Sequence, residues 1–313
     1  MKPKKIKLPE TREAWLKQRK TGIGGSDAGI ILGVNKYKSA YTLWAEKSGL
    51  VDPEDVQTEA TWLGNQLEEI VAKRFEEETG KKVQRSSFSY KSAEHPFMLA
   101  NIDRKVVGEN AGLECKSANL FTEQDYRADV IPPSYYAQIL HYMAVMDFDR
   151  MYLAVAVLQR GFFIYTIERE DPAVQADMEA LIEAEAAFWE NVQTGAAPEM
   201  DGSASTSDTL NRMDKKGGDL TFLDELIEHR DQLKAEADEI DEQIRQAENL
   251  IKEKMNDHGF DFGFSSQYSV RWKEQEKTTI DTKKLKAEYP EVAEKCSRIS
   301  TSRPLMIRRK KSK

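Results

Sequence analysis

The order of the predicted elements favours an α/β fold in which helices flank a central sheet. Two kinds of pattern carry this prediction: long stretches with apolar residues at helical spacing, and short apolar runs with the length and composition of strands. Helices that alternate with strands in this way cover the faces of a sheet. Along the chain they are 59–79 (helix), 82–92, 97–103 and 111–117 (strands), 135–145 (helix), 150–158 and 161–168 (strands), and 174–192 (helix).

Length and composition narrow the class of protein. The 313 residues suggest one large domain or two, and 40% hydrophobic residues suffice for a packed core. No run of about twenty apolar residues could span a membrane, and the lysine-rich start lacks the apolar segment of a secretory signal. Cys115 and Cys296 are too few for a disulfide framework or a four-cysteine iron–sulfur cluster. We therefore expect a cytoplasmic protein.

The formal net charge of −8 is unevenly distributed. Residues 1–20 hold eight Lys and Arg against two Glu, and residues 301–313 hold six Lys and Arg without an acidic residue. The acidic total argues against a nucleic-acid coat protein, but it allows local basic patches that bind phosphates.

The chain begins with a helix predicted over 9–20, followed by a glycine-rich turn over 21–33. Ser26 or Asp27 is expected to cap the apolar helix that follows. A glycine-rich turn that enters a helix presents free backbone N–H groups and can bind an anion, and Arg19 could add a bidentate phosphate contact. A simple capped turn explains the same residues.

Two further helices are predicted over 39–48 and 59–79. The second carries an apolar stripe that we expect in the core, formed by Trp62, Leu63, Leu67, Ile70, Val71 and Phe75. Glu68 lies beside this stripe. It is either a solvated glutamate or a carboxylate directed at a metal site.

The stretch 97–117 predicts a hairpin that gathers charged side chains. Asp103 ends its first apolar run, and Glu114 and Lys116 lie two residues apart in the second, so these two share a face. Pairing across the turn would bring Asp103 beside them. Two carboxylates and a lysine suit a hard divalent cation such as Mg²⁺ and a water that the lysine orients or deprotonates. The alternative is a surface hairpin whose charges face solvent.

The following segment completes the predicted sheet. Pro132 and Pro133 precede an apolar helix that contains Gln138 and His141, of which the histidine is expected to be a packing or surface residue. Two strands joined by a turn at 159–161 follow, and then the acidic amphipathic helix 174–192.

The remainder is predicted to be a separate part. Residues 1–195 form the core, and 196–220, rich in small and polar residues, form a linker. Residues 221–313 form a C-terminal extension with a long helix over 221–255, whose single apolar stripe suits a helical hairpin or a coiled coil. A small hairpin, a helix over 281–296 and a basic tail follow.

The chain resembles the YqaJ-like viral recombinase family, whose fold and site are similar to those of the phage lambda exonuclease, in the PD-(D/E)xK nuclease superfamily. The resemblance covers roughly residues 10–195 and implies a restriction-endonuclease-like core with a central mixed sheet. Five motifs in the family's order carry it: Arg19 through Ser26, Gly64 through Glu68, Leu99 through Asp103, Leu113 through Lys116, and Tyr135 through Gln138.

The resemblance also implies roles for these residues. Asp103 and Glu114 would hold the catalytic Mg²⁺, or Mn²⁺ in its place, and the backbone carbonyl of Cys115 would complete the shell. Glu68 would support the metal centre, and Lys116 would position or deprotonate the attacking water.

In the same way, Gln138 would orient Lys116 or the scissile phosphate, and Arg19 and Ser26 would bind the 5′-phosphate of a DNA end. The implied activity is ATP-independent resection of linear double-stranded DNA from its 5′ ends. It leaves 3′ single-stranded overhangs for a single-strand annealing protein of the RecT type. The resemblance further implies a homo-oligomer, such as a ring-shaped trimer.

One departure from the family pattern concerns the site aspartate. Ile102 and Arg104 stand where the family often has Pro and Gly, which makes Arg104 a candidate DNA contact instead. Two other functions compete with the exonuclease. The first is an endonuclease, which would nick circular DNA, and the second is a DNA-end-binding scaffold without catalysis.

Overall fold

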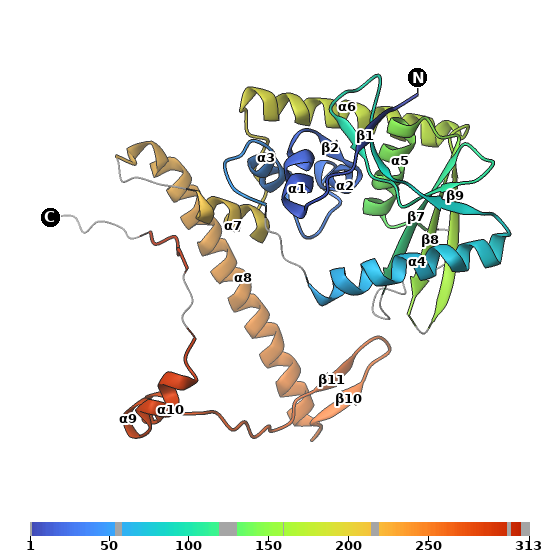
Figure 1. The fold of residues 1–313 in the computed structure, drawn as a ribbon. Coiled ribbons are helices and arrows are strands. Elements are labelled where there is room, and N and C mark those ends of the chain that lie inside the picture. Colours follow the sequence, from blue (N-terminus) through green and yellow to red (C-terminus); the bar gives the residue numbers. More distant parts are fainter. Residues whose placement is uncertain are drawn as a thin grey trace. The chain divides into compact units, whose positions relative to one another are not determined.

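The computed structural model describes residues 2–53, 58–118, 130–158, 160–213, 219–298 and 302–307 (Figure 1). Part of the predicted turn at 159–161, part of the predicted linker and most of the basic tail lie outside these ranges. The chain divides into two compact units, Met1–Asp214 and Lys215–Lys313.

A five-stranded mixed sheet forms the centre of the first unit. The parallel pair β7–β8 is connected through a helix, and the remaining pairs are antiparallel. This confirms the predicted α/β fold with a central mixed sheet. In spatial order the strands are β3 (Val83–Arg85), β6 (Arg104–Val106), β7 (Ala111–Ala118), β8 (Arg150–Val157) and β9 (Gly161–Glu168).

A second sheet of four strands corrects the predicted hairpin. Residues 97–103 do not pair with 111–117, because Met98–Ala100 (β5) joins this second sheet and only β6 pairs with β7. All three residues of β5 are buried, which is typical of an internal strand covered on both faces. The predicted strand 82–92 likewise divides between the sheets. The order here is β1 (Lys4–Lys7), β4 (Phe88–Lys91), β5 and β2 (Ile23–Gly24).

Helices cover both faces of the five-stranded sheet (Figure 1). Phe75 of α4 packs against Leu113 and Tyr152 on one face. On the other face Met143 of α5 packs against Leu153, with α6 beyond it. The helices of this unit are α1 (Arg12–Lys20), α2 (Gly25–Ile31), α3 (Ala40–Lys47), α4 (Glu59–Thr79), α5 (Pro133–Met146), α6 (Pro172–Thr194) and α7 (Ala204–Arg212).

Only the second half of α4 belongs to the core. Val71 and Phe75 are buried as predicted, whereas Trp62 and Ile70 are 53% and 61% exposed and Leu63 is also exposed. The core prediction is therefore wrong for these three residues. The first turns of α4 line a cavity together with β7 instead of covering the sheet.

His141 is a core residue that joins α5, α6 and β5. Its side chain is fully buried, with Nδ1 lying 2.8 Å from Glu185 Oε1 and Nε2 lying 2.9 Å from the carbonyl oxygen of Leu99. Burial disfavours the charged ring, but the Glu185 carboxylate and both hydrogen bonds raise the pKa of His141 above its usual range. An imidazolium donates from both nitrogens and satisfies both acceptors.

Breaking this pair is expected to make the first unit much less stable. Glu185→Gln should lower the free energy of unfolding by about 3–5 kcal/mol, because it leaves a buried ring without its counter-charge. Since the pKa of His141 is raised by folding, the stabilisation is complete below about pH 6.5 and is lost as the pH rises through the folded-state pKa.

Urea unfolding at a series of pH values measures this slope. The wild-type protein should lose stability with rising pH, and Glu185→Gln should lack that loss. Glu183→Gln, an exposed change two residues away on the same helix, should behave as wild type. Equal slopes in all three proteins would contradict the charged pair.

Helix α7 corrects the predicted linker at 196–220. Residues 204–212 of this stretch form a helix that contacts α3 through hydroxyl groups. Thr42 Oγ1 lies 2.8 Å from Thr209 Oγ1, and Thr206 Oγ1 donates to Ser39 Oγ at 2.8 Å. The small polar residues of this stretch are typical of a linker. The sequence does not show that their hydroxyl groups form hydrogen bonds with one another in a buried contact.

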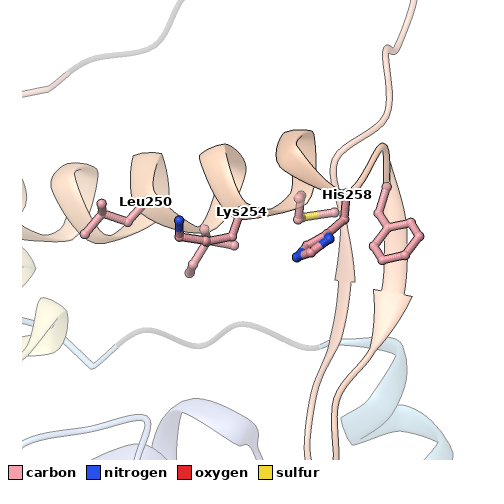
Figure 2. A pocket seen from close by; sticks show the side chains of 6 residues that line it. Leu250, Lys254 and His258 are labelled. Carbon is pink, nitrogen blue, oxygen red and sulfur yellow. The ribbon is translucent and has the colours of Figure 1, made fainter.

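The second unit is built on one long helix without a buried residue, α8. Its last turns and the residues after it line a cavity of about 420 Å³ (Figure 2). The predicted helix 281–296 is two short helices, because Pro290 interrupts it. The elements are η2 (Thr221–Leu223), α8 (Asp224–Asp257), β10 (Phe262–Phe264), β11 (Ser269–Arg271), α9 (Thr282–Glu288) and α10 (Pro290–Lys295). Across the described residues, no helix has the length and apolarity to span a membrane.

Candidate active site

A cavity of about 300 Å³ collects most of the predicted site residues. It lies between the first turns of α4 and the strand β7. Carboxylates from α4, from β7 and from the connection between β5 and β6 line it, together with the lysine of β7. Its lining consists of Ala60, Thr61, Gly64, Asn65, Glu68, Asp103, Glu114, Cys115, Lys116 and Ser117.

Asp103 is fixed to β7 although it lies outside the sheet. It follows β5, where the chain crosses from one sheet to the other, and its Oδ2 accepts a hydrogen bond from the backbone N–H of Cys115 at 2.8 Å. Burial and the nearby negative charge of Glu114 raise the pKa of Asp103 well above its usual range. A bound cation would relieve the repulsion between these two carboxylates.

Glu114 has one satisfied and one unsatisfied oxygen. Its Oε1 accepts from Lys116 Nζ at 2.6 Å and from Gln138 Nε2 at 2.7 Å. Its Oε2 is buried and has no hydrogen-bond partner in the described structure. A buried carboxylate oxygen of this kind needs a partner, and a cation that shares the cavity with Asp103 would supply one.

The donor set suits a hard divalent cation that keeps part of its water shell. No three His, Cys, Asp or Glu side chains in the described ranges are grouped to hold a metal ion. Mg²⁺ is commonly held by one or two carboxylates and several waters. Asp103 and Glu114 therefore fit such an ion without a third side chain, and the predicted contribution of the Cys115 carbonyl stays a prediction.

Glu68 lines the cavity, but Arg104 holds its carboxylate. The Arg104 guanidinium donates to Glu68 Oε1 and, at 2.8 Å, to Glu69 Oε2. Arg104 is buried, so its prediction as a DNA contact is wrong: its charge is used within the protein. The residue that departs from the family pattern thus fixes Glu68 in the wall of the cavity.

Gln138 and Lys116 meet at Glu114, and α5 adds a tyrosine that sequence reasoning missed. Gln138 Nε2 also lies 3.0 Å from the hydroxyl of Tyr142. The two residues are four apart, so they share one face of the helix, and this spacing was the available signal. Lys116 Nζ lies 5.1 Å from the ring centre of Tyr135. Burial opposes the charge of Lys116, but Glu114 and Asp103 raise its pKa.

Arg19 and Ser26, the predicted phosphate-binding residues, lie in contact with each other. Arg19 Nη2 lies 2.9 Å from Ser26 Oγ and 2.9 Å from Asp27 Oδ1. The cap of α2 is Gly24, not Ser26 or Asp27: Asp27 is the third helical residue, and its Oδ2 accepts from the Gly24 N–H at 2.9 Å. Asp27 is thus an internal anchor that holds the arginine in place.

Lys47 is a second anchor that the sequence did not reveal. Its buried ammonium donates to Asp27 Oδ2 at 2.7 Å and to the Gly22 carbonyl at 2.6 Å. Burial raises the pKa of Asp27, but Lys47 and Arg19 outweigh it and hold that pKa well below its usual range. The pairing depends on a residue from α3, which local spacing does not predict.

One glycine connects the two clusters. A Cβ on Gly25 of α2 would lie 2.5 Å from the ring of Tyr142, so a residue with a side chain would push α2 away from α5. Tyr142 contacts Gln138, which contacts Glu114. Direct packing therefore joins the Arg19 cluster (Arg19, Ser26, Asp27 and Lys47) to the cavity lined by Asp103 and Glu114.

Comparison with known proteins identifies the family of the chain. A family model described as the YqaJ-like viral recombinase domain matches residues 14–149. The uncharacterized protein YqaJ of Bacillus subtilis (strain 168) is 39% identical over 294 residues, covering 91% of this chain and 90% of that protein.

Among solved structures, the alkaline exonuclease LHK-Exo from Laribacter hongkongensis is similar. In complex with dAMP it aligns with a TM-score of 0.50 and 21% identity, over 58% of this chain and 93% of its own. At this identity the likeness shows the fold alone, and it agrees with the predicted α/β core.

Proposed function

The chain belongs to the YqaJ-like viral recombinase family, and from this membership and its site we propose that it is a metal-dependent exonuclease of double-stranded DNA. The proposal assigns it resection of linear DNA from the 5′ ends without ATP. The product would be a 3′ single-stranded overhang. The observation that carries the proposal is the cavity in which Asp103, Glu114 and Lys116 meet.

Asp103 and Glu114 would hold the divalent ion, for which we propose Mg²⁺ or Mn²⁺. When bound, such an ion lowers the pKa of a coordinated water and neutralises the charge of the phosphodiester. Glu68 stays in the wall of the cavity as a further carboxylate, held by Arg104. The buried, unpaired Oε2 of Glu114 supports this assignment.

Lys116 and Gln138 would act on the water and the phosphate. The Lys116 ammonium lies 2.6 Å from Glu114 Oε1, and the other oxygen of that carboxylate is the unpaired Oε2 assigned to the ion. From there it can orient an attacking water or deliver a proton. Gln138 contacts Glu114 rather than Lys116, so we assign it to orienting the carboxylate, with Tyr142 behind it.

The Arg19 cluster supports cleavage from an end over internal cleavage. Arg19 and Ser26 are held together by Asp27, and Arg19 retains guanidinium N–H groups that can donate to a phosphate. A terminal 5′-phosphate occurs only at a DNA end, so an endonuclease has no use for such a pocket. An annealing protein of the RecT type and a homo-oligomer, such as a ring-shaped trimer, complete the proposal.

Removal of the terminal phosphate tests this pocket. Linear duplex with 5′-hydroxyl ends should be degraded more slowly than duplex with 5′-phosphates, by about tenfold or more. The reason is that a charge-assisted hydrogen bond contributes roughly 1.5–3 kcal/mol of binding free energy. Arg19→Ala should slow degradation of the phosphorylated duplex and erase the difference.

The matched control for Arg19 is Lys17→Ala, which removes one positive charge from an exposed site on the same helix. It should keep the preference for phosphorylated ends. Equal wild-type rates on both substrates would refute the pocket.

A further inference from the structure

The hairpin β10–β11 exposes an aromatic face that no part of the proposed nuclease site uses. No residue of either strand is buried, and Phe262 and Phe264 are 53% and 82% exposed. Exposed aromatic residues on a two-stranded hairpin are costly in water. A ligand that covers these rings would remove their apolar surface from water.

The strand register places cations on the same face as the phenyl rings. Phe262 pairs with Arg271, and Phe264 pairs with Ser269, so these four side chains share one face. Lys273 follows Arg271 by two residues, and its ammonium lies 4.5 Å from the centre of the Phe262 ring. The other face carries Gly263 and Val270.

The charge of the hairpin differs from that of the helix before it. Residues 259–273 hold two Arg and Lys against one Asp, whereas α8 holds twelve Asp and Glu against five Arg and Lys. Lys273 Nζ lies 3.3 Å from that aspartate, Asp261. Arg271 forms no ion pair in the described part of the chain, so its charge remains for a ligand.

We propose that this face, formed by Phe262, Phe264 and Arg271, binds single-stranded DNA. Flat aromatic rings stack on unpaired bases of any sequence, and neighbouring cations contact the phosphates between them. Duplex DNA hides its base faces, so the chemistry selects a single strand. The proposal rests on the proposed function only for the source of that strand, the overhang left by resection.

The test measures binding of the full chain to a fluorescent oligothymidylate with 5′-hydroxyl ends in the presence of a chelator. Without a terminal phosphate the Arg19 pocket is not engaged, and without metal nothing is cleaved. Replacing Phe262 and Phe264 together by Ala should weaken binding about tenfold or more, because each stacked base accounts for roughly fivefold to 150-fold in affinity.

Two further variants separate stacking from charge. Arg271→Gln should weaken binding and reduce the slope of log affinity against log salt by about 0.7, the value for one phosphate contact on a single strand. Val270→Ala, on the opposite face of the same hairpin, should bind as wild type. Cleavage of duplex DNA in the presence of metal should be retained in all of these variants.

Ultraviolet cross-linking of the wild-type protein to the same oligonucleotide locates the contact directly. Adducts mapped by mass spectrometry should fall in residues 259–273. Adducts confined to residues 1–214 would overturn the proposal. It would also be overturned if the double phenylalanine variant bound normally but changed the mass of the assembly in light scattering, because the rings would then lie between copies of the chain.

Discussion

Glu114→Gln should abolish DNA cleavage while the protein stays folded. Glutamine keeps an oxygen that can accept the hydrogen bonds of Lys116 and Gln138, so the packing around β7 is retained. It removes the charge that would bind the metal. Losing several kcal/mol of transition-state stabilisation should lower the cleavage rate by about 10³-fold or more. Asp103→Asn should act in the same way, because its oxygen can still accept from the N–H of Cys115.

Thermal unfolding separates lost metal binding from a lost fold. Added Mg²⁺ or Mn²⁺ should raise the Tm of the wild-type protein, because a ligand of the folded state stabilises it. It should not raise the Tm of Glu114→Gln. Glu69→Gln, which changes an exposed carboxylate beside Glu68, should keep both activity and the metal-dependent Tm. Wild-type cleavage by Glu114→Gln would refute the metal centre.

Lys116→Met should also be severely impaired, by about 10²- to 10⁴-fold, the range for a positioned acid or base. Methionine is similar in length and apolar, so it can stay against the ring of Tyr135 without an ammonium group. It removes the donor that lies 2.6 Å from Glu114. Lys116→Arg should not restore activity, since a planar guanidinium does not reproduce the geometry of an ammonium.

The metal-dependent Tm distinguishes Lys116 from the carboxylates. Lys116→Met leaves Asp103 and Glu114 in place, so added metal should still stabilise this variant. If the metal effect disappeared together with activity, Lys116 would be needed to organise the carboxylates. Its assignment to the water or the phosphate would then be wrong.

Local signals in the sequence were enough to predict several elements. The predicted bounds of α4 agree with the structure because Thr58 caps its first turn and Gly80 ends it with a left-handed backbone. The pattern could not show that the chain changes sheets at residues 101–103, since buried runs look alike in either sheet. It also missed α7, whose hydroxyl contacts with α3 join residues more than 160 positions apart.

In the candidate site, contacts within one strand could be predicted from the sequence, whereas contacts between separate elements could not. Glu114 and Lys116 share a face of one strand by simple alternation, so their proximity was predictable. Two charged contacts depend instead on how separate elements pack: Arg104 donates to Glu68, and Lys47 donates to Asp27. A charged residue has the same sequence signature whether it faces DNA or another side chain, so the sequence alone does not predict the contacts of Arg104 and Lys47.

The most direct test of the central claim compares two DNA substrates in the presence of Mg²⁺. One is a linear duplex with 5′-phosphates and a label at each type of end, and the other is a covalently closed circle. The proposed exonuclease should release the 5′ label first, leave 3′ single strands and leave the circle intact. Nicking of the circle, or earlier release of the 3′ label, would contradict the account.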